Sequence, residues 1–146
     1  VFGVSPRMRM DLLVNFFTYK AMTDEYIILF EKHFKRNYIH IQDVASAFIF
    51  MMDNFKENKG EAFNVGLSDA NISKAELCDK IKEYVPKFVV SSNEYYSDPD
   101  QRDYIVSNDK IESRGWKPQF SLEDGIKELI KAYTIISNTH NEFTNL

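Results

Sequence analysis

Two patterns of apolar residues run along this chain. Short apolar, β-prone runs predict strands, and longer stretches with apolar residues at i, i+3 and i+4 predict amphipathic helices. The predicted strands are 1–3, 26–30, 38–41, 62–65, 88–90 and 104–106. The predicted helices are 11–22, 43–55, 73–85, 108–111 and 121–136. Because strands and helices alternate, the predicted fold class is α/β.

Polar residues mark where the predicted helices begin. Asp11 and Asp43 each precede an apolar stripe, so each is expected to cap its helix. Ser73, followed by Glu76 three residues later, predicts a capping box, and Ser121 is expected to cap the last helix. The tail from residue 137 is polar and expected to fray.

Composition limits the possible functions. A chain of 146 residues is one domain by length, and its net charge of −4 argues against a nucleic-acid-binding surface. No apolar window reaches the roughly 18 residues that a membrane span needs. The single cysteine, Cys78, excludes an internal disulfide and fits a cytoplasmic protein. His33, His40 and His140 are scattered, so no metal site is predicted.

The first residues, VFGVSP, have no starting Met and no basic stretch before an apolar run, so they do not form a signal peptide. They read as the end of a buried strand, which is typical of a fragment. If the chain is a fragment, residues 1–3 and 62–65 belong to a parallel sheet whose other strands are missing. The apolar faces of 12–19 and 44–55 are then expected to be exposed and to meet the absent part or a second copy.

The run from Arg36 to Ala45, RNYIHIQDVA, leads a cation directly into an apolar segment, and an acidic residue then opens a helix. This run, followed by Phe63-Asn64-Val65-Gly66, resembles the second half of the extended short-chain dehydrogenase/reductase family. These enzymes are NAD-dependent nucleotide-sugar epimerases and dehydratases. The resemblance implies the C-terminal part of a Rossmann-like fold: the last parallel strands plus the small substrate-binding lobe. Residues 1–136 would form the substrate-binding half, and 137–146 a polar tail.

Arg36 and Arg102 are the first candidate site residues. From the residues alone, an arginine before a strand is usually a solvated edge charge, although its planar fork can also grip a phosphate. The resemblance implies that Arg36 contacts the diphosphate of a nucleotide sugar. It also implies that Arg102 completes the grip from the opposite side, within the segment DPDQRDY. The alternative for Arg102 is a local ion pair with Asp100 or Asp103.

Arg7, Arg9 and Phe30 complete the substrate-binding candidates. By resemblance, Arg7 and Arg9 belong to a loop that folds over the sugar, and a solvated basic turn is an equal alternative. Phe30 ends the strand that borders the nucleobase in the family. The family's glycine-rich turn after this strand is absent, and residues 31–34 read EKHF instead. The base is therefore left open.

Asp43 and His40 are interpreted as structural, Asp43 as a helix cap and His40 as a satisfied interior histidine. Asn64 and Gly66 are also interpreted as structural: the glycine lets the chain turn, and the asparagine bonds to nearby backbone.

The chain lacks the family's cofactor motifs. It contains no G-x-x-G-x-x-G loop for a dinucleotide and no Y-x-x-x-K pair, so no catalytic or cofactor-binding residue is assigned. The resemblance implies that NAD or NADP is bound by an absent N-terminal Rossmann half and that the intact enzyme is a homodimer. This chain alone is predicted to be inactive. The alternatives are a reductase of a non-sugar substrate and a non-catalytic nucleotide-sugar-binding or assembly module.

Overall fold

The computed structural model describes residues 1–93, 102–138 and 144–145. The helices are α1 (Leu13–Thr23), α2 (Ile41–Asp53), α3 (Phe55–Asn58), α4 (Lys74–Tyr84), α5 (Asp109–Ser113) and α6 (Leu122–Asn138). The strands are β1 (Met8–Arg9), β2 (Tyr26–Leu29), β3 (Lys35–Asn37), β4 (Asn71–Ser73), β5 (Val89–Ser92) and β6 (Thr144–Asn145). The α/β class is confirmed.

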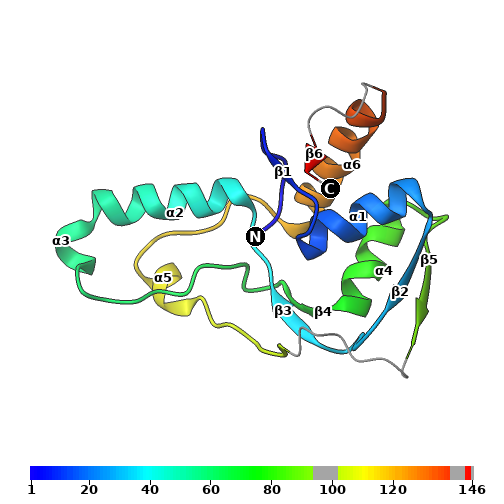
Figure 1. Ribbon diagram of the computed structural model, residues 1–146. Helices are drawn as coiled ribbons and strands as arrows, with labels where there is room; N and C mark the ends of the chain where they lie inside the picture. Colours follow the sequence, from blue (N-terminus) through cyan, green and yellow to red (C-terminus); the bar gives the residue numbers. More distant parts are fainter. Residues whose placement is uncertain (94–101, 139–143, 146) are drawn as a thin grey trace.

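Within the described ranges, the strands form three separate two-stranded sheets (Figure 1). Strands β2 and β5 are parallel, with Tyr26 opposite Val89. Strands β3 and β4 are antiparallel, with Arg36 opposite Ile72, and β1 pairs in parallel with β6 near the chain's end. A single parallel bridge joins Phe2 to the backbone at His40, so the predicted strand at 1–3 is reduced to one paired residue.

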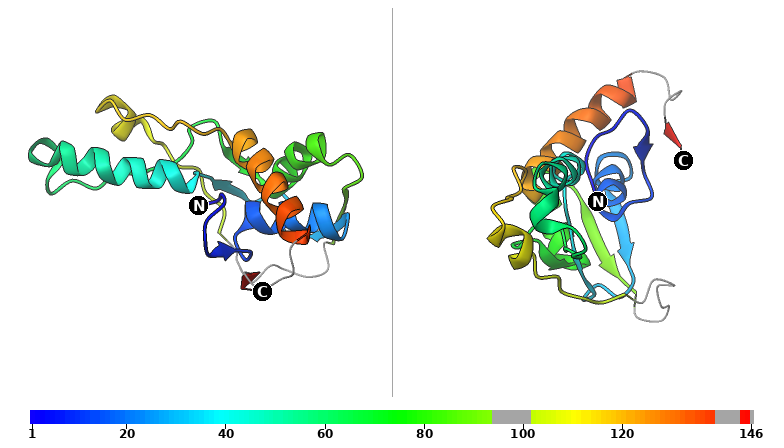
Figure 2. Two further views of the ribbon diagram at one scale, coloured as in Figure 1. Left: turned by 90° about the horizontal axis from the view of Figure 1, so that it is seen from above. Right: turned by 90° about the vertical axis from the view of Figure 1, so that its left-hand side faces the viewer.

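The molecule has two parts of unequal thickness (Figures 1 and 2). Helices α1, α4 and α6 pack with the β2–β5 pair around the larger core, whose most buried side chains include Leu77, Ile81, Phe88 and Leu129. Helices α2, α3 and α5 form an arm that extends away from this core. A smaller core of Ile39, Ala47, Ile111 and Trp116 holds the arm together.

Two predicted helix caps are confirmed. The Ser73 hydroxyl accepts the backbone N–H of Glu76, whose carboxylate in turn accepts the N–H of Ser73, so the capping box forms at the start of α4. The Ser121 hydroxyl accepts the N–H of Asp124 at the start of α6, at 3.1 Å.

Two predicted caps are wrong. Leu12, not Asp11, is the N-cap residue of α1, and no side chain caps that end. The carboxylate of Asp11 binds the guanidinium of Arg9 instead, at 2.8 Å from Nε. Helix α2 begins two residues earlier than predicted because the His40 ring accepts the N–H of Gln42 and so caps it. Asp43 lies inside the first turn.

Three predicted strands are also wrong. The strand expected at 38–41 lies at 35–37, where the polar residues of β3 pair with β4. Residues 62–65 and 104–106 have no regular secondary structure and pair with no strand among the described residues. At 104–106 a side chain bonds to the backbone in place of a neighbouring strand. The side-chain amide of Asn71 donates to the carbonyl of Val106 and accepts the N–H of Val106, both at 2.9 Å.

Candidate functional site

Strand β3, the start of α1 and the segment after residue 101 surround one polar cavity of about 260 Å³. The cavity draws on parts of the chain that are about 90 residues apart in the sequence. Its lining residues in the described part of the chain are Val1, Asp11, Leu12, Leu13, Val14, Arg36, Asn37, Tyr38, Arg102 and Tyr104. The structure therefore brings Arg36 and Arg102 together at one cavity.

Arg36 is held in a fixed orientation. It is only 4% exposed, and its guanidinium lies over the ring of Tyr104, 5.4 Å from the ring centre. One terminal nitrogen donates to the carbonyl of Lys35 at 2.9 Å. This arrangement differs from a solvated edge charge, because a buried cation needs fixed partners to offset its lost hydration.

Arg102 reaches the cavity because its segment is bonded to the start of β3. The carboxylate of Asp103 accepts the N–H of Lys35 at 2.7 Å, and the N–H of Tyr104 donates to the carbonyl of Lys35 at 3.3 Å. Asp103 thus bonds to the backbone of a strand 68 residues away. Asp100, the other partner considered for Arg102, lies outside the described residues.

Tyr38 and the start of α1 also line the cavity. Tyr38 is 4% exposed, and its hydroxyl has no hydrogen-bond partner in the described structure. Burial raises the pKa of this phenol, so it remains a protonated donor. The uncapped N-terminus of α1 also lines the cavity at Leu12 to Val14. A helix N-terminus carries partial positive charge on its open N–H groups.

The donor set suits an anion with several acceptor oxygens. Two arginines and a helix N-terminus line the cavity, and phosphate groups match all of them. Asp11 is the one acidic residue among the described lining residues. Its contact with Arg9 lowers the pKa of its carboxyl to about 2, so it carries a negative charge that Arg9 balances.

The other three candidates do not line this cavity among the described residues. Arg7 and Arg9 are exposed beside it on β1 and the preceding loop, and Arg9 binds Asp11. Phe30 follows β2, and its carbonyl accepts the buried ammonium of Lys74 at 2.9 Å. Glu31 follows with a φ of 49°, a left-handed conformation that favours glycine. A glutamate thus occupies a left-handed position in the turn after β2.

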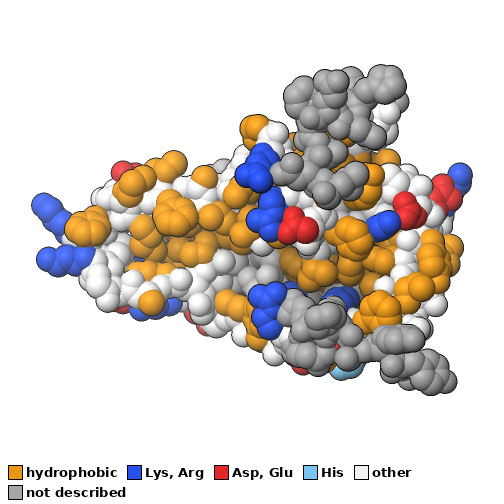
Figure 3. Space-filling view, in the orientation of Figure 1, with side chains coloured by type: hydrophobic (Ala, Val, Ile, Leu, Met, Phe, Trp, Pro, Cys, Tyr) orange, Lys and Arg blue, Asp and Glu red, His pale blue; other side chains and the backbone are white. Residues whose placement is uncertain are grey.

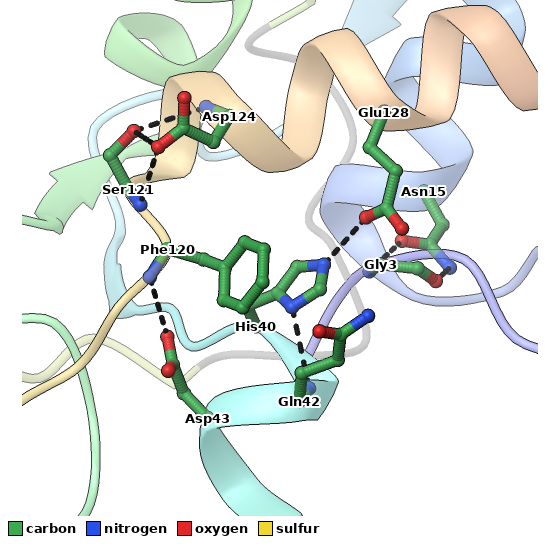
Figure 4. A network of polar contacts seen from close by, with 9 residues as sticks. All are labelled: Gly3, Asn15, His40, Gln42, Asp43, Phe120, Ser121, Asp124 and Glu128. Atoms are coloured by element: carbon green, nitrogen blue, oxygen red, sulfur yellow. Dashed lines mark hydrogen bonds and ion pairs between the residues drawn. The ribbon is translucent and has the colours of Figure 1, made fainter. Parts of the chain in front are cut away.

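His40 is a satisfied interior histidine, as predicted (Figure 4). It is fully buried, its Nε2 lies 2.6 Å from the carboxylate of Glu128 on α6, and its ring stacks on Phe120. Asp43 accepts the N–H groups of Gln119 at 2.8 Å and Phe120 at 3.1 Å. These residues join the start of α2 to α6 and to the segment before it. Sequence reasoning missed Glu128 and Phe120, since nothing local marks partners nearly 80 or more residues away.

The motif residues Asn64 and Gly66 have structural contacts. The Asn64 amide donates to the carbonyl of Ser107 at 3.2 Å, as expected for a backbone contact. Gly66 is required for a different reason than predicted. A Cβ on Gly66 would lie 1.7 Å from the amide oxygen of Asn37, so the position needs glycine because the chains approach closely there.

Helix α2 exposes an apolar face (Figure 3). The side chains of Phe48, Met52 and Phe55 are 69%, 67% and 63% exposed. Between this helix and segment 62–65 runs an apolar groove of about 260 Å³. Its lining residues are Val44, Ala47, Phe48, Met51, Phe63 and Val65. The predicted exposure of the 44–55 face is confirmed.

The predicted exposure of the 12–19 face is wrong. Val14 and Phe17 on α1 are buried, because α6 and α4 pack against this helix. The hydroxyl of Tyr133 on α6 also donates to the carbonyl of Asn15 at 3.0 Å. The described residues contain no group of His, Cys, Asp or Glu that could hold a metal ion. In the same residues, no helix has the length and apolar character to cross a membrane.

Known proteins share both the sequence and the fold of this chain. Residues 4–66 match the NAD dependent epimerase/dehydratase family. The chain is 34% identical over 101 residues to the probable GDP-L-fucose synthase 1 of Oryza sativa subsp. japonica, which covers 67% of this chain and 29% of that protein. It is also 34% identical over 114 residues to the dTDP-D-glucose 4,6-dehydratase of Mus musculus, covering 73% of this chain and 31% of that protein.

Solved structures agree in fold at lower identity. The UDP-glucose 4-epimerase of Thermotoga maritima superposes with a TM-score of 0.69 at 23% identity, covering 85% of this chain and 40% of that one. The dTDP-glucose 4,6-dehydratase of Bacillus anthracis gives 0.69 at 18% identity, covering 92% and 43%. The chain thus spans about a third of the length of the two curated relatives.

Proposed function

This chain belongs to the extended short-chain dehydrogenase/reductase family of NAD-dependent nucleotide-sugar epimerases and dehydratases, and we propose that residues 1–136 form the nucleotide-sugar-binding half of such an enzyme. The observation that carries this proposal is the cavity shared by Arg36 and Arg102. The GDP, dTDP and UDP sugars named for the relatives all contain a diphosphate.

A diphosphate fits the cavity by charge and by hydrogen bonding. Each guanidinium can donate two parallel hydrogen bonds to a phosphate, and charge-assisted bonds contribute about 1.5–3 kcal/mol each. Arg36 is already oriented by Tyr104 and Lys35, so binding costs little side-chain entropy. The N-terminus of α1 supplies further donors.

The role of this half in the reaction is positioning. In the proposed parent enzyme, NAD or NADP bound elsewhere would accept a hydride from the carbon that bears a sugar hydroxyl. The hydroxyl proton would go to a base outside this chain, and the resulting ketone would be epimerised or dehydrated. The residues of this chain hold the diphosphate, so the sugar at its end points in one direction. Arg7 and Arg9 are proposed to meet the sugar or phosphate from the cavity's rim, and Phe30 to border the base.

The cofactor half is proposed to cover the apolar face of α2. That face and segment 62–65, which pairs with no strand among the described residues, have the properties of a sheet edge with its covering helix: half-buried Phe63 and Val65 lie beside exposed Phe48. The chain's span of about a third of its curated relatives leaves room for a Rossmann half in the intact protein. We further propose that the intact enzyme is a cytoplasmic homodimer.

The test is steady-state kinetics of the full-length gene product with a panel of UDP-, GDP-, CDP- and dTDP-sugars. Arg36→Ala and Arg102→Ala are each expected to raise KM about ten- to hundredfold, since each removes charge-assisted contacts to the diphosphate. Arg114→Ala is the matched control. This exposed arginine pairs with Glu61, and neither residue is among those that line the cavity.

Two results would decide against the proposal. An unchanged KM in both cavity variants would show that the arginines do not bind substrate. A full-length product that binds nucleotide sugars without converting any of them would favour the non-catalytic binding module.

A further inference from the structure

Asp103 lies between two residues that line the cavity. Arg102 and Tyr104 both contribute to its wall, and Asp103 does not. The carboxylate of Asp103 is instead directed to the start of β3, where it accepts the N–H of Lys35 at 2.7 Å.

Few other hydrogen bonds among the described residues hold this segment in place. Residues 102–105 are exposed and belong to no helix or strand. Besides the Asp103 bond, the N–H of Tyr104 donates to Lys35 at the longer distance of 3.3 Å, and Asn71 holds Val106 further along. A carboxylate accepting a backbone N–H forms a stronger bond than a neutral pair. Asp103 therefore supplies the strongest described bond near Arg102.

The bond also affects Arg36. Tyr104, the residue after Asp103, provides the ring under the Arg36 guanidinium. The bond from Asp103 to Lys35 therefore acts on both arginines. It holds Arg102, the preceding residue, and it holds Tyr104, whose ring contacts Arg36.

We propose that Asp103 is a positioning residue that assembles the two-arginine grip on the diphosphate, acting through Arg102 and Tyr104 without touching the ligand. This inference rests on the proposed function, because it assumes that the cavity binds a nucleotide diphosphate. It assigns to Asp103 a role in ligand affinity and no part in the chemical step.

The test is a calorimetric titration of the full-length gene product with dTDP-glucose, and with inorganic pyrophosphate as a probe that carries the diphosphate alone. Asp103→Ala is expected to raise Kd for both probes about three- to tenfold, the range that loss of one positioning hydrogen bond gives. Asp103→Asn keeps an acceptor oxygen and is expected to stay within about twofold of the unmodified protein. Asp109→Ala removes an exposed carboxylate from the same region and is expected to change nothing.

A double-mutant cycle separates positioning from a general loss of stability. In the Arg102→Ala background, Asp103→Ala is expected to have a clearly smaller effect on Kd, because one of the groups it positions is gone. Thermal unfolding midpoints of the Asp103 variants should match that of Asp109→Ala.

The inference is overturned by an Asp103→Ala variant that binds both probes normally, by an Asp103→Asn variant as weak as the alanine, or by full additivity with Arg102→Ala. If Arg36→Ala and Arg102→Ala also bind normally, or no variant and no unmodified protein binds either probe, the proposed function itself fails.

Discussion

The carboxylate of Asp43 accepts two backbone N–H groups, from Gln119 and Phe120, although 76 and 77 residues separate the partners. The Asp43 side chain is 1% exposed, so the carboxylate itself is shielded from water. Beside it, the ring of Phe120 stacks on His40 at 4.4 Å. One carboxylate in the first turn of α2 therefore fixes the segment that leads into α6.

Replacing Asp43 by alanine should lower the free energy of unfolding by about 3 kcal/mol, since it removes the carboxylate that accepts two backbone N–H groups. Asp43→Asn keeps one acceptor oxygen and should lose less. Asp53→Ala, at the exposed end of the same helix, serves as the control. Urea denaturation measures all three, and a loss below about 0.5 kcal/mol for Asp43→Ala would contradict this account.

The sequence predicted two of the residues that line the candidate site. The motif pattern pointed to Arg36 and Arg102, and the structure brings both to one cavity. It did not point to Tyr38, which counted only as one apolar position in a short run, although its hydroxyl faces no partner among the described residues. Nor did it reveal Asp103 as a bond to β3, because a contact across 68 residues has no local signal.

Among the elements, α4 shows how a local signal specifies a helix start. Ser73 and Glu76 satisfy each other's backbone N–H groups, so two of the open donors at this end are capped. The bond from the N–H of Ser73 lowers the pKa of the Glu76 carboxyl below its ordinary value of 4.5, and the Ser73 hydroxyl adds to the effect.

This shift predicts an acid-sensitive contribution to stability. Because the folded pKa of Glu76 is depressed, its contribution is present above about pH 4.5 and is lost as the pH falls through the lower folded value. Glu76→Gln should therefore be less stable than the unmodified chain at pH 7, and the difference should shrink towards pH 3. Denaturant midpoints between pH 3 and 7 measure this, with Glu83→Gln on the same helix as control. A difference that is constant with pH would contradict the prediction.

Helix starts were easier to predict from the sequence than strands, because their signals are local. The starts of α4 and α6 depend on residues three positions apart, which a sequence displays directly. Strand β3 is polar, and only its pairing with β4 makes it a strand, so the pattern placed the strand at the apolar residues that follow it. Residues 62–65 have the apolar pattern of a strand but no partner strand in the described chain.

At the scale of the whole molecule, the described core leaves the apolar face of α2 uncovered. Helix α2 lies in an arm away from the larger core (Figure 2). Its Phe48 and Met52 side chains are 69% and 67% exposed. Exposed apolar side chains of this size, beside a groove, are typical of an interface.

Substituting glutamate for both Phe48 and Met52 should reduce binding of an apolar dye and self-association of this chain, without lowering its unfolding midpoint. In the full-length gene product the same double substitution should destabilise the protein, since two charges would be buried against the proposed cofactor half. Val89→Glu, at an exposed apolar residue on β5, is the control. Light scattering and thermal unfolding give both readouts. Equal stability of the full-length variant would show that this face remains in solvent.

The central claim is that this chain binds the nucleotide sugar and leaves the dinucleotide to another part of the enzyme. The most direct measurement is a calorimetric titration of the 146-residue chain with UDP-, GDP-, CDP- and dTDP-sugars and, separately, with NAD. The account predicts weak binding of at least one nucleotide sugar, its loss in the Arg36→Ala, Arg102→Ala double variant, and no binding of NAD. Binding of NAD with an affinity typical of a dehydrogenase, or nucleotide-sugar binding that does not depend on the two arginines, would contradict it.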